Sequence, residues 1–305
     1  MPDREYVTVL LPTYDEAATI GDCVEGFQAE GFDDVLVIDG DSDDDTREIA
    51  REHGARVEIQ SGSGKGQAIR EAVREHIDRE YVLMADGDGT YKSEDADRML
   101  APLDDGYDHV IGDRFANMED GAMTRLNQIG NRLTNNLFSR IHGEPFADIL
   151  SGYRAFSRAS FERMTLSADG FGIETEMAVE CAKRDIPTTV VPITYLERPA
   201  GSSTNLHPIR DGSIIFLELF RRAKTNNPLF YFGSIGVGSG VAGSLIALYV
   251  ALEWFVYGIP HQIWALAGAA GILLGVQLVM FGVLSDLILT LHREQLDWIE
   301  TLSDD

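Results

Sequence analysis

The sequence predicts an α/β fold, a single large domain built on a mostly parallel sheet, followed by a hairpin of two membrane-spanning helices. The first 200 residues alternate between short apolar runs of strand length and longer helical patterns, which is typical of a parallel sheet covered by helices on both faces. Beyond Pro228 the composition changes to two long uncharged stretches. A chain of 305 residues is long enough for one domain with a full core and an additional segment.

Each expected strand is a short run of β-branched or apolar residues. These runs lie at residues 6–11, 35–39, 56–60, 81–86 and 109–112, and the helical patterns between them lie at residues 19–30, 45–53, 66–76 and 94–103. Because ligands collect at the carboxyl ends of the strands in such sheets, we expect the functional residues at those ends.

The expected membrane helices are residues 229–252 and 263–285, which contain no charged residue. Each is longer than the roughly 20 apolar residues that span a bilayer. Their many glycines suit the close approach of helices within lipid. Two buried helices of a soluble core are the alternative, but a soluble domain rarely needs helices that are apolar all round.

Lys and Arg flank this hairpin at its two outer ends. Arg221, Arg222 and Lys224 precede the first stretch, Arg293 follows the second, and the connection at residues 253–262 contains neither Lys nor Arg. The positive-inside rule therefore places both ends in the cytoplasm. The first apolar run is only of strand length, so we expect no signal peptide and a cytoplasmic α/β domain on a multi-pass membrane protein.

The expected organisation has four parts. They are the α/β domain at residues 1–210, an amphipathic juxtamembrane connection at 211–228, the two membrane helices at 229–291 and an acidic cytoplasmic tail at 292–305. Residues 198–210 are rich in Gly, Ser, Thr and Asn between two Arg, a composition that suits a lid over a site near the membrane. An ordinary linker is the alternative.

The charge balance is strongly acidic, with 50 Asp and Glu against 25 Lys and Arg and a formal net charge of −25. Such a balance argues against nucleic acid as a partner, because a phosphate backbone needs a basic surface. It also argues against electrostatic docking on anionic lipid through a polybasic patch. A solvated acidic surface is the simplest interpretation, and the composition is similar to that of proteins from extreme halophiles.

Acidic clusters follow three of the expected strands. Asp15 and Glu16 follow the first, residues 39–46 follow the second, and Asp86 and Asp88 follow the fourth. Carboxylates gathered at one edge repel each other unless a positive charge lies between them. A hard cation with oxygen ligands answers this, so we predict Mg²⁺ or Mn²⁺ held by Asp86 and Asp88 and by substrate phosphates.

Ordinary structural roles remain open for these motifs. An Asp-x-Asp pair is equally typical of helix caps and turns. The acidic run at 39–44 does not match a calcium loop, because Asp44 stands where the loop needs Gly and Ala50 stands where it needs Glu. Residues 61–66 are similar to a phosphate-binding loop but lack the Walker spacing. Lys65 within them is a candidate nucleotide contact.

Taken in order, these motifs resemble the family-2 glycosyltransferases with a GT-A fold, and among them the polyprenyl-phosphate hexosyltransferases (dolichyl-phosphate mannose and glucose synthases). The resemblance covers roughly residues 5–210. Its carriers are Leu11-Pro12-Thr13-Tyr14-Asp15-Glu16, residues 37–46, Gly64-Lys65-Gly66-Gln67-Ala68, Asp86-Gly87-Asp88-Gly89-Thr90-Tyr91, Gly112-Asp113-Arg114, residues 148–154, Gly172-Ile173-Glu174-Thr175-Glu176 and Arg198-Pro199-Ala200-Gly201-Ser202-Ser203.

The resemblance implies roles for the matching residues. Asp86 would lie near the donor, and Asp88 would bind the metal that bridges the donor diphosphate. Contacts to the base and ribose would come from Pro12, Tyr14, Glu16 and Asp39. Acceptor and phosphate contacts would come from Arg114, Arg132 and Arg198, the last from a mobile loop.

Three positions depart from the family pattern. Asp41 stands one position later than the second Asp of the usual Val-Asp-Asp-x-Ser, Thr90 replaces the Gln common in mannose synthases, and Asp113 replaces the Ser of their Gly-Ser-Arg. These differences favour a UDP-hexose over GDP-mannose as the donor.

The reaction implied is transfer of a hexose to a polyprenyl (dolichyl) phosphate, metal-dependent and inverting, and the halophile-like composition suggests a role in protein N-glycosylation. Arg114 and Asp148 are the candidate catalytic residues, Asp148 as a base or orienting carboxylate, although a structural role at the turn of Ser151 and Gly152 is equally open. Two other functions remain: extension of a lipid-linked sugar, and a non-enzymatic membrane-tethered nucleotide-sugar sensor. The Gln-x-x-Arg-Trp motif of processive synthases does not occur.

Overall fold

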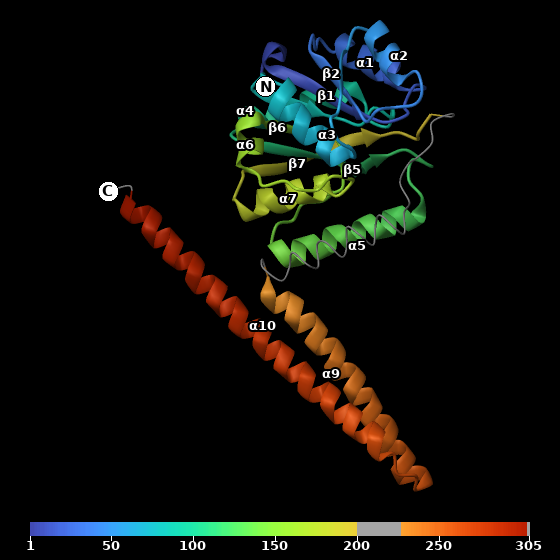
Figure 1. The fold of residues 1–305 in the computed structure, drawn as a ribbon, viewed down its shortest axis with the longest axis vertical. Helices are drawn as coiled ribbons and strands as arrows, with labels where there is room; N and C mark the ends of the chain where they lie inside the picture. The colour runs from blue at the N-terminus through green and yellow to red at the C-terminus, as the bar shows by residue number, and fades with distance from the viewer. Residues whose placement is uncertain (200–226, 304–305) are drawn as a thin grey trace. The chain divides into compact units, whose positions relative to one another are not determined.

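The structure is a computed structural model that describes residues 1–199 and 227–303. The chain divides into two compact units, Met1–Phe216 and Leu217–Asp305, and each is described by itself (Figure 1). The domain boundaries expected at residues 210 and 228 fall beside or within residues 200–226, outside the described part, and remain predictions. The basic residues Arg221, Arg222 and Lys224 and most of the expected lid also lie there.

The first unit is built on one seven-stranded sheet with the order β3-β2-β1-β4-β6-β5-β7. β6 runs antiparallel to both of its neighbours, and every other pairing is parallel. The predicted mostly parallel sheet is therefore confirmed. The strands are β1 (Val7–Thr13), β2 (Val35–Asp39), β3 (Arg56–Ile59), β4 (Tyr81–Met84), β5 (His109–Met118), β6 (Arg154–Ser157) and β7 (Thr188–Tyr195).

Helices fill the connections between the strands. The four expected helices are present, and the one predicted at residues 66–76 divides into α3 and a π-helical turn, η2. The helical elements of this unit are η1 (Arg4–Tyr6), α1 (Ile20–Ala29), α2 (Thr46–Glu52), α3 (Lys65–Glu71), η2 (Ala72–His76), η3 (Ser93–Asp95), α4 (Ala96–Asp104), α5 (Arg125–His142), α6 (Arg158–Arg163) and α7 (Ile173–Lys183).

The core explains why β1 is central. All seven residues of β1 are buried, and apolar side chains of β1, β2, α1 and α4 join in one hydrophobic cluster. β2 lies on one side of β1 and β4 on the other. The connections leave β1 and β4 in opposite directions along the sheet, and sheets of this kind bind ligands at the carboxyl ends of the strands where the order reverses.

β6 and β7 are not among the strands that the hydrophobic pattern predicts, and β6 carries a buried cation. Arg154 has no exposed surface. Its guanidinium donates hydrogen bonds to the carbonyl oxygens of Ser151, Ile149 and Glu174 and faces the His109 ring at 3.0 Å. Full hydrogen bonding makes the burial of this charge tolerable.

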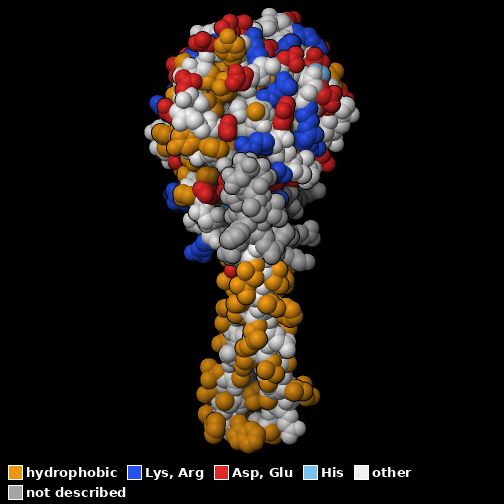
Figure 2. Space-filling model, turned by 90° about the vertical axis from the view of Figure 1, so that its left-hand side faces the viewer, with side chains coloured by type: hydrophobic (Ala, Val, Ile, Leu, Met, Phe, Trp, Pro, Cys, Tyr) orange, Lys and Arg blue, Asp and Glu red, His pale blue; other side chains and the backbone are white. Residues whose placement is uncertain are grey.

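The second unit is a helical hairpin of α9 (Pro228–Leu252), a short π-helical turn η4 (Glu253–Tyr257) and α10 (Gln262–Ser303). Its two candidate spans, Pro228–Tyr257 and Gln262–Leu289, bury only 17% and 11% of their most apolar windows. Apolar side chains cover the hairpin surface in Figure 2, unlike the core helices of a soluble protein. α10 continues as a helix through the region expected to be an acidic tail.

Glycines allow α9 and α10 to approach closely. A Cβ at Gly243 would lie 2.6 Å from the carbonyl oxygen of Gly268, and a Cβ at Gly275 would lie 2.6 Å from that of Gly236. Ser239 also donates a hydrogen bond to the Gly271 carbonyl. Small residues and an interhelical hydrogen bond are the usual means of helix association in lipid.

Candidate functional site

The candidate site lies at the carboxyl ends of β1, β2 and β4. The loop after β1 holds Tyr14, Asp15 and Glu16, the loop after β2 holds the acidic run at 40–45, and Asp86 and Asp88 follow β4. The three acidic clusters identified in the sequence thus meet at one edge of the sheet.

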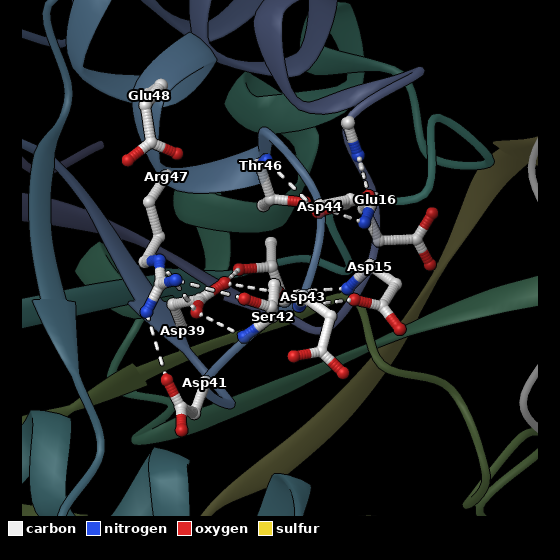
Figure 3. A network of polar contacts seen from close by, with 12 residues as sticks. Asp15, Glu16, Asp39, Asp41, Ser42, Asp43, Asp44, Thr46, Arg47 and Glu48 are labelled. Atoms are coloured by element: carbon white, nitrogen blue, oxygen red, sulfur yellow. Dashed lines mark hydrogen bonds and ion pairs between the residues drawn. The ribbon is translucent and has the colours of Figure 1, made fainter.

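The loops after β1 and β2 are tied together by their own carboxylates (Figure 3). Asp39, which has no exposed surface, accepts hydrogen bonds from the backbone N–H and the hydroxyl of Ser42. Ser42 in turn accepts from the Asp15 N–H, and Asp15 accepts from the Asp43 N–H. The expected contact of Asp39 with a nucleotide remains a prediction, and in this structure its carboxylate shapes the loop.

Tyr14, Gly40 and Gln60 lie together beside this loop. Tyr14 is 45% exposed, and a Cβ at Gly40 would lie 3.0 Å from the Tyr14 ring and 3.3 Å from Gln60 Nε2. Gln60 is buried at the end of β3, and its Oε1 has no hydrogen-bond partner among the described residues. An unsatisfied buried amide needs an explanation, and a planar ligand with N–H and carbonyl groups would satisfy it. Pro12 is buried within β1.

Lys65 joins two carboxylates of the site. Its Nζ lies 2.5 Å from Asp86 Oδ1 and 2.5 Å from Glu174 Oε1. Burial alone would lower the pKa of Lys65, but the two carboxylates more than offset this and raise it well above its ordinary value. Lys65 therefore stays charged and fixes the direction of Asp86.

The glycines around Lys65 are required by a backbone contact. A Cβ at Gly64 or Gly66 would lie 2.2 or 2.1 Å from the carbonyl oxygens of Asp169 and Ala168, respectively. This close approach brings the segment before α7, and with it Glu174, against the amino end of α3. The Gly-Lys-Gly motif therefore works as a packing element that delivers Lys65.

Asp88 faces a cation supplied by the chain itself. Its Oδ1 accepts hydrogen bonds from the N–H and hydroxyl of Thr90, and its Oδ2 lies 2.5 Å from Arg198. Arg198 also pairs with Glu16 at 3.3 Å. Burial lowers and the two carboxylates raise the pKa of Arg198, with a net increase. Arg198 thus lies directly on the carboxylate predicted to hold the metal.

Arg114 and Asp148 form a buried bidentate pair. Arg114 Nε and Nη2 donate to the two carboxylate oxygens of Asp148 at 2.7 and 2.8 Å, and the Arg114 N–H donates to the same carboxylate. Burial opposes and Asp148 favours the charged form, and the pKa of Arg114 lies well above its usual value. The geometry favours the orienting role for Asp148 over that of a general base.

Arg132 lies apart from these pairs. It is exposed on α5, and its guanidinium stands 5.7 Å above the ring of Phe115, the neighbour of Arg114 in β5. No described contact joins Arg132 to the other two arginines, and its expected role in phosphate binding remains a prediction.

Sequence reasoning assigned no role to Gln60 or Glu174. Glu174 stands in a motif noted for its resemblance, and an acidic residue in the first turn of a helix is usually explained by the helix dipole alone. Gln60 follows a weakly patterned edge strand. The position of Gln60 at a parallel strand end is the one sequence signal that could have identified it.

The residues present fit a divalent cation at Asp88. One oxygen of Asp88 is fixed by Thr90 and the other already faces a positive group. The three groups of ion pairs hold five carboxylates against three cations, a net charge of −2. The described residues contain no cluster of three or more potential ligands, so a cation would take further ligands from a diphosphate and water.

Comparisons with known proteins agree with this geometry. Residues 8–165 match the family described as glycosyl transferase family 2. Glycosyltransferase AglJ of Haloferax volcanii is 66% identical over 302 residues, which are 99% of this chain and 100% of that protein. The dolichyl-phosphate hexose transferase of the same organism is 35% identical over 211 residues, covering 68% of this chain and 90% of that protein.

Solved structures share the fold. Glucosyl-3-phosphoglycerate synthase from Mycobacterium tuberculosis, in complex with Mn²⁺, UDP-glucose and phosphoglyceric acid, superimposes with a TM-score of 0.60 at 21% identity and covers 71% of this chain and 79% of its own. With the family matched over more than half of its length and a relative 66% identical along nearly all of it, the chain belongs to glycosyl transferase family 2 and is a glycosyltransferase.

Proposed function

We propose that the protein transfers a hexose from a nucleotide-diphosphate sugar, preferably a UDP-hexose, to a polyprenyl or dolichyl phosphate at the cytoplasmic face of the membrane. The observation that carries this proposal is the union of a family-2 domain with an apolar hairpin in one chain. A lipid acceptor gives the domain a reason to be held at a bilayer. Relatives named as a dolichyl-phosphate hexose transferase and a polyprenol monophosphomannose synthase support it.

The donor would lie at the carboxyl ends of β1, β2 and β4. Tyr14, Gly40 and Gln60 supply a flat surface and an unsatisfied amide for the base, and Asp86, fixed by Lys65, faces the sugar-diphosphate side. Gly40 has no side chain that could form a hydrogen bond with the base. The buried amide of Gln60 is therefore the polar group available for this contact. A uracil ring offers both an N–H and carbonyl oxygens to such an amide.

Asp88 would hold Mg²⁺ or Mn²⁺ together with the donor diphosphate. A bound divalent cation neutralises charge that develops on the leaving diphosphate. Arg198 pairs with the same carboxylate. The ion pair between Arg198 and Asp88 must therefore break when the donor binds together with its divalent cation. The Arg198 guanidinium is then available to phosphate oxygens, which it matches in a bidentate manner.

The acceptor phosphate needs positioning more than it needs a base. A phosphate monoester has a second pKa near 6, so its oxygen is already largely deprotonated at neutral pH. It attacks the anomeric carbon as the bond to the diphosphate breaks, and the diphosphate takes the electron pair. In-line attack inverts the configuration, giving a β-linked product from an α-linked donor.

The Arg114–Asp148 pair supports a phosphate acceptor. Asp148 is fully engaged by Arg114, which leaves it poorly placed to remove a proton from a sugar hydroxyl. Arg114 is held rigid, charged and close to the Tyr195 ring. This arrangement favours phosphate binding over extension of a lipid-linked sugar.

The experiment is to supply purified protein with a panel of nucleotide-sugars and a polyprenyl phosphate, and to identify the lipid product by mass spectrometry. We expect one hexosyl-phosphate lipid from one donor, with the anomeric proton coupling of a β linkage. Asp88→Ala should abolish product, and Asp22→Ala, at a carboxylate on α1 outside the site, should not. Undiminished product from Asp88→Ala would refute the metal assignment, and no product with any polyprenyl phosphate would refute the function.

A further inference from the structure

One helix in the described part of the first unit, α5, carries an exposed apolar stripe. Leu126, Ile129 and Leu133 of α5 are 60%, 67% and 58% exposed. Spacings of three and four residues place them along a single face of the helix. No other described helix of this unit has more than one large apolar side chain so exposed, so this stripe is not ordinary surface scatter.

The same helix is locally basic in a strongly acidic chain. Its 18 residues contain Arg125, Arg132 and Arg140 and no Asp or Glu, whereas acidic residues outnumber basic ones two to one in the whole chain. All three arginines are exposed. The heptad spacing that relates Leu126 to Leu133 also relates Arg125 to Arg132, so these two arginines border the apolar stripe, and Arg140, seven residues after Leu133, continues it.

We propose that this face of α5 lies at the surface of an anionic bilayer, as a second membrane contact of the protein. An apolar stripe bordered by Arg is typical of helices that lie in the headgroup and acyl boundary, and anionic headgroups complement the arginines. The inference rests on the membrane anchoring in the proposed function. The overall charge of −25 argues against basic docking only as an average, and α5 is a local exception to it.

The opposite face of α5 is fixed to the site. Asn135, which is buried, donates to the Ala147 carbonyl and accepts from the Ile149 N–H, on either side of Asp148. Asp148 in turn holds Arg114. A membrane contact through α5 would therefore hold the phosphate-binding side of the site at the level of the lipid headgroups.

A second copy of the chain is a less suitable occupant. Three apolar side chains fall short of the roughly 1,200–2,000 Å² that a stable interface buries. Two such faces would also bring arginines together, and like charges across an interface are unfavourable. A lipid surface needs neither a large area nor an opposite charge on another protein.

The test is a depth measurement on the full chain in vesicles. Cys23 and Cys181 are the only cysteines, so a background without them accepts a spin label at Ile129→Cys. Relative exposure of the label to oxygen and to a water-soluble nickel chelate reports its depth. Tyr107→Cys, 40% exposed on the same unit, is the aqueous control, and Leu245→Cys, 62% exposed on α9, is the lipid control.

In vesicles containing phosphatidylglycerol we expect the Ile129 label about 5–10 Å below the headgroups, the Leu245 label deeper and the Tyr107 label in water. In pure phosphatidylcholine the Ile129 label should become shallower. A Leu245 label in lipid with an Ile129 label in water would overturn this inference alone. A Leu245 label in water would overturn the membrane anchor and this inference with it. Spin–spin broadening between Ile129 labels would show that α5 contacts a second copy of the chain, and would overturn the lipid contact.

Discussion

The charged residues of the site form ion pairs with one another. Lys65, Arg114 and Arg198 each neutralise buried or half-buried carboxylates. A buried charge is tolerated when it is paired and hydrogen-bonded, and these cations also fix the directions of the carboxylates that would meet the donor. The acidic edge of the sheet is therefore organised before any ligand arrives, which reduces the cost of binding a charged donor.

Replacement of Asp148 separates its two possible roles. Asp148→Asn keeps the shape but leaves the Arg114 guanidinium buried without an anion, which should cost about 3–5 kcal/mol of stability. We expect a lower melting temperature and a raised KM for the acceptor phosphate. Asp113→Asn removes a neighbouring carboxylate whose described side-chain bond is to the Phe115 N–H, and should be mild. An Asp148→Asn protein that melts normally but turns over slowly would instead identify a general base.

The sequence indicates which residues gather at the site but not how they pair. Asp86, Asp88 and Lys65 are foreseeable because they stand at strand and helix ends in a parallel sheet. The contact of Arg198 with Asp88 joins residues 110 positions apart, and no local pattern encodes such a pairing. The position of Glu174 depends on how the backbone of residues 168–170 packs, and the position of Gln60 depends on how the turn at Gly40 packs. Both are tertiary contacts.

At the scale of elements, β1 to β5 follow from their apolar runs, whereas β6 and β7 are not among the strands that the sequence predicts. A buried Arg in a strand breaks the pattern from which strands are recognised, and the antiparallel position of β6 follows from pairings that composition does not reveal. The hairpin is the opposite case. Its two helices begin within one residue of the predicted positions, because lipid imposes length and apolarity directly, but α10 continues beyond the predicted end at residue 285 to Ser303.

The contact between β5 and β6 predicts an acid sensitivity. His109 is fully buried, and this burial, followed by the nearby Arg154 cation, holds its pKa well below the ordinary value of 6.5. As the pH falls through 6.5, the unfolded chain takes up a proton on His109 and the folded protein does not, so the free energy of unfolding should fall by up to about 1.4 kcal/mol per pH unit. His109→Phe should remove this part of the slope between pH 6.5 and 5.5, as measured by thermal unfolding. His53→Phe, at a part-exposed ring, serves as control, and equal slopes would contradict the assignment.

The helix pair of the hairpin predicts a contrast between two glycines. Gly243→Val would force a side chain against the Gly268 carbonyl, whereas Gly238 has open space around it. Overpacking of this kind costs about 1–3 kcal/mol. All three Trp residues lie in the second unit, so Trp fluorescence during thermal unfolding reports on the hairpin. Gly243→Val should lower its midpoint and Gly238→Val should not; equal midpoints would show that the helices do not pack as described.

At the scale of the whole molecule, the domain and the hairpin point to one substrate. A family-2 domain supplies donor chemistry, the arginines suit a phosphate nucleophile, and the hairpin explains why that phosphate would be carried by a lipid. The acidic composition agrees with relatives from Haloferax volcanii, since acidic surfaces keep proteins soluble at high salt. A role in protein N-glycosylation remains a proposal that follows from the acceptor.

The acceptor is the central claim, and a competition experiment tests it most directly. Purified protein in lipid nanodiscs is incubated with its donor and with equal amounts of a polyprenyl phosphate and a polyprenyl-linked sugar. The lipid products are then identified by mass spectrometry. We expect a polyprenyl phosphate carrying a single hexose and an unchanged lipid-linked sugar. A lipid-linked sugar extended by one hexose, with the polyprenyl phosphate untouched, would contradict this expectation.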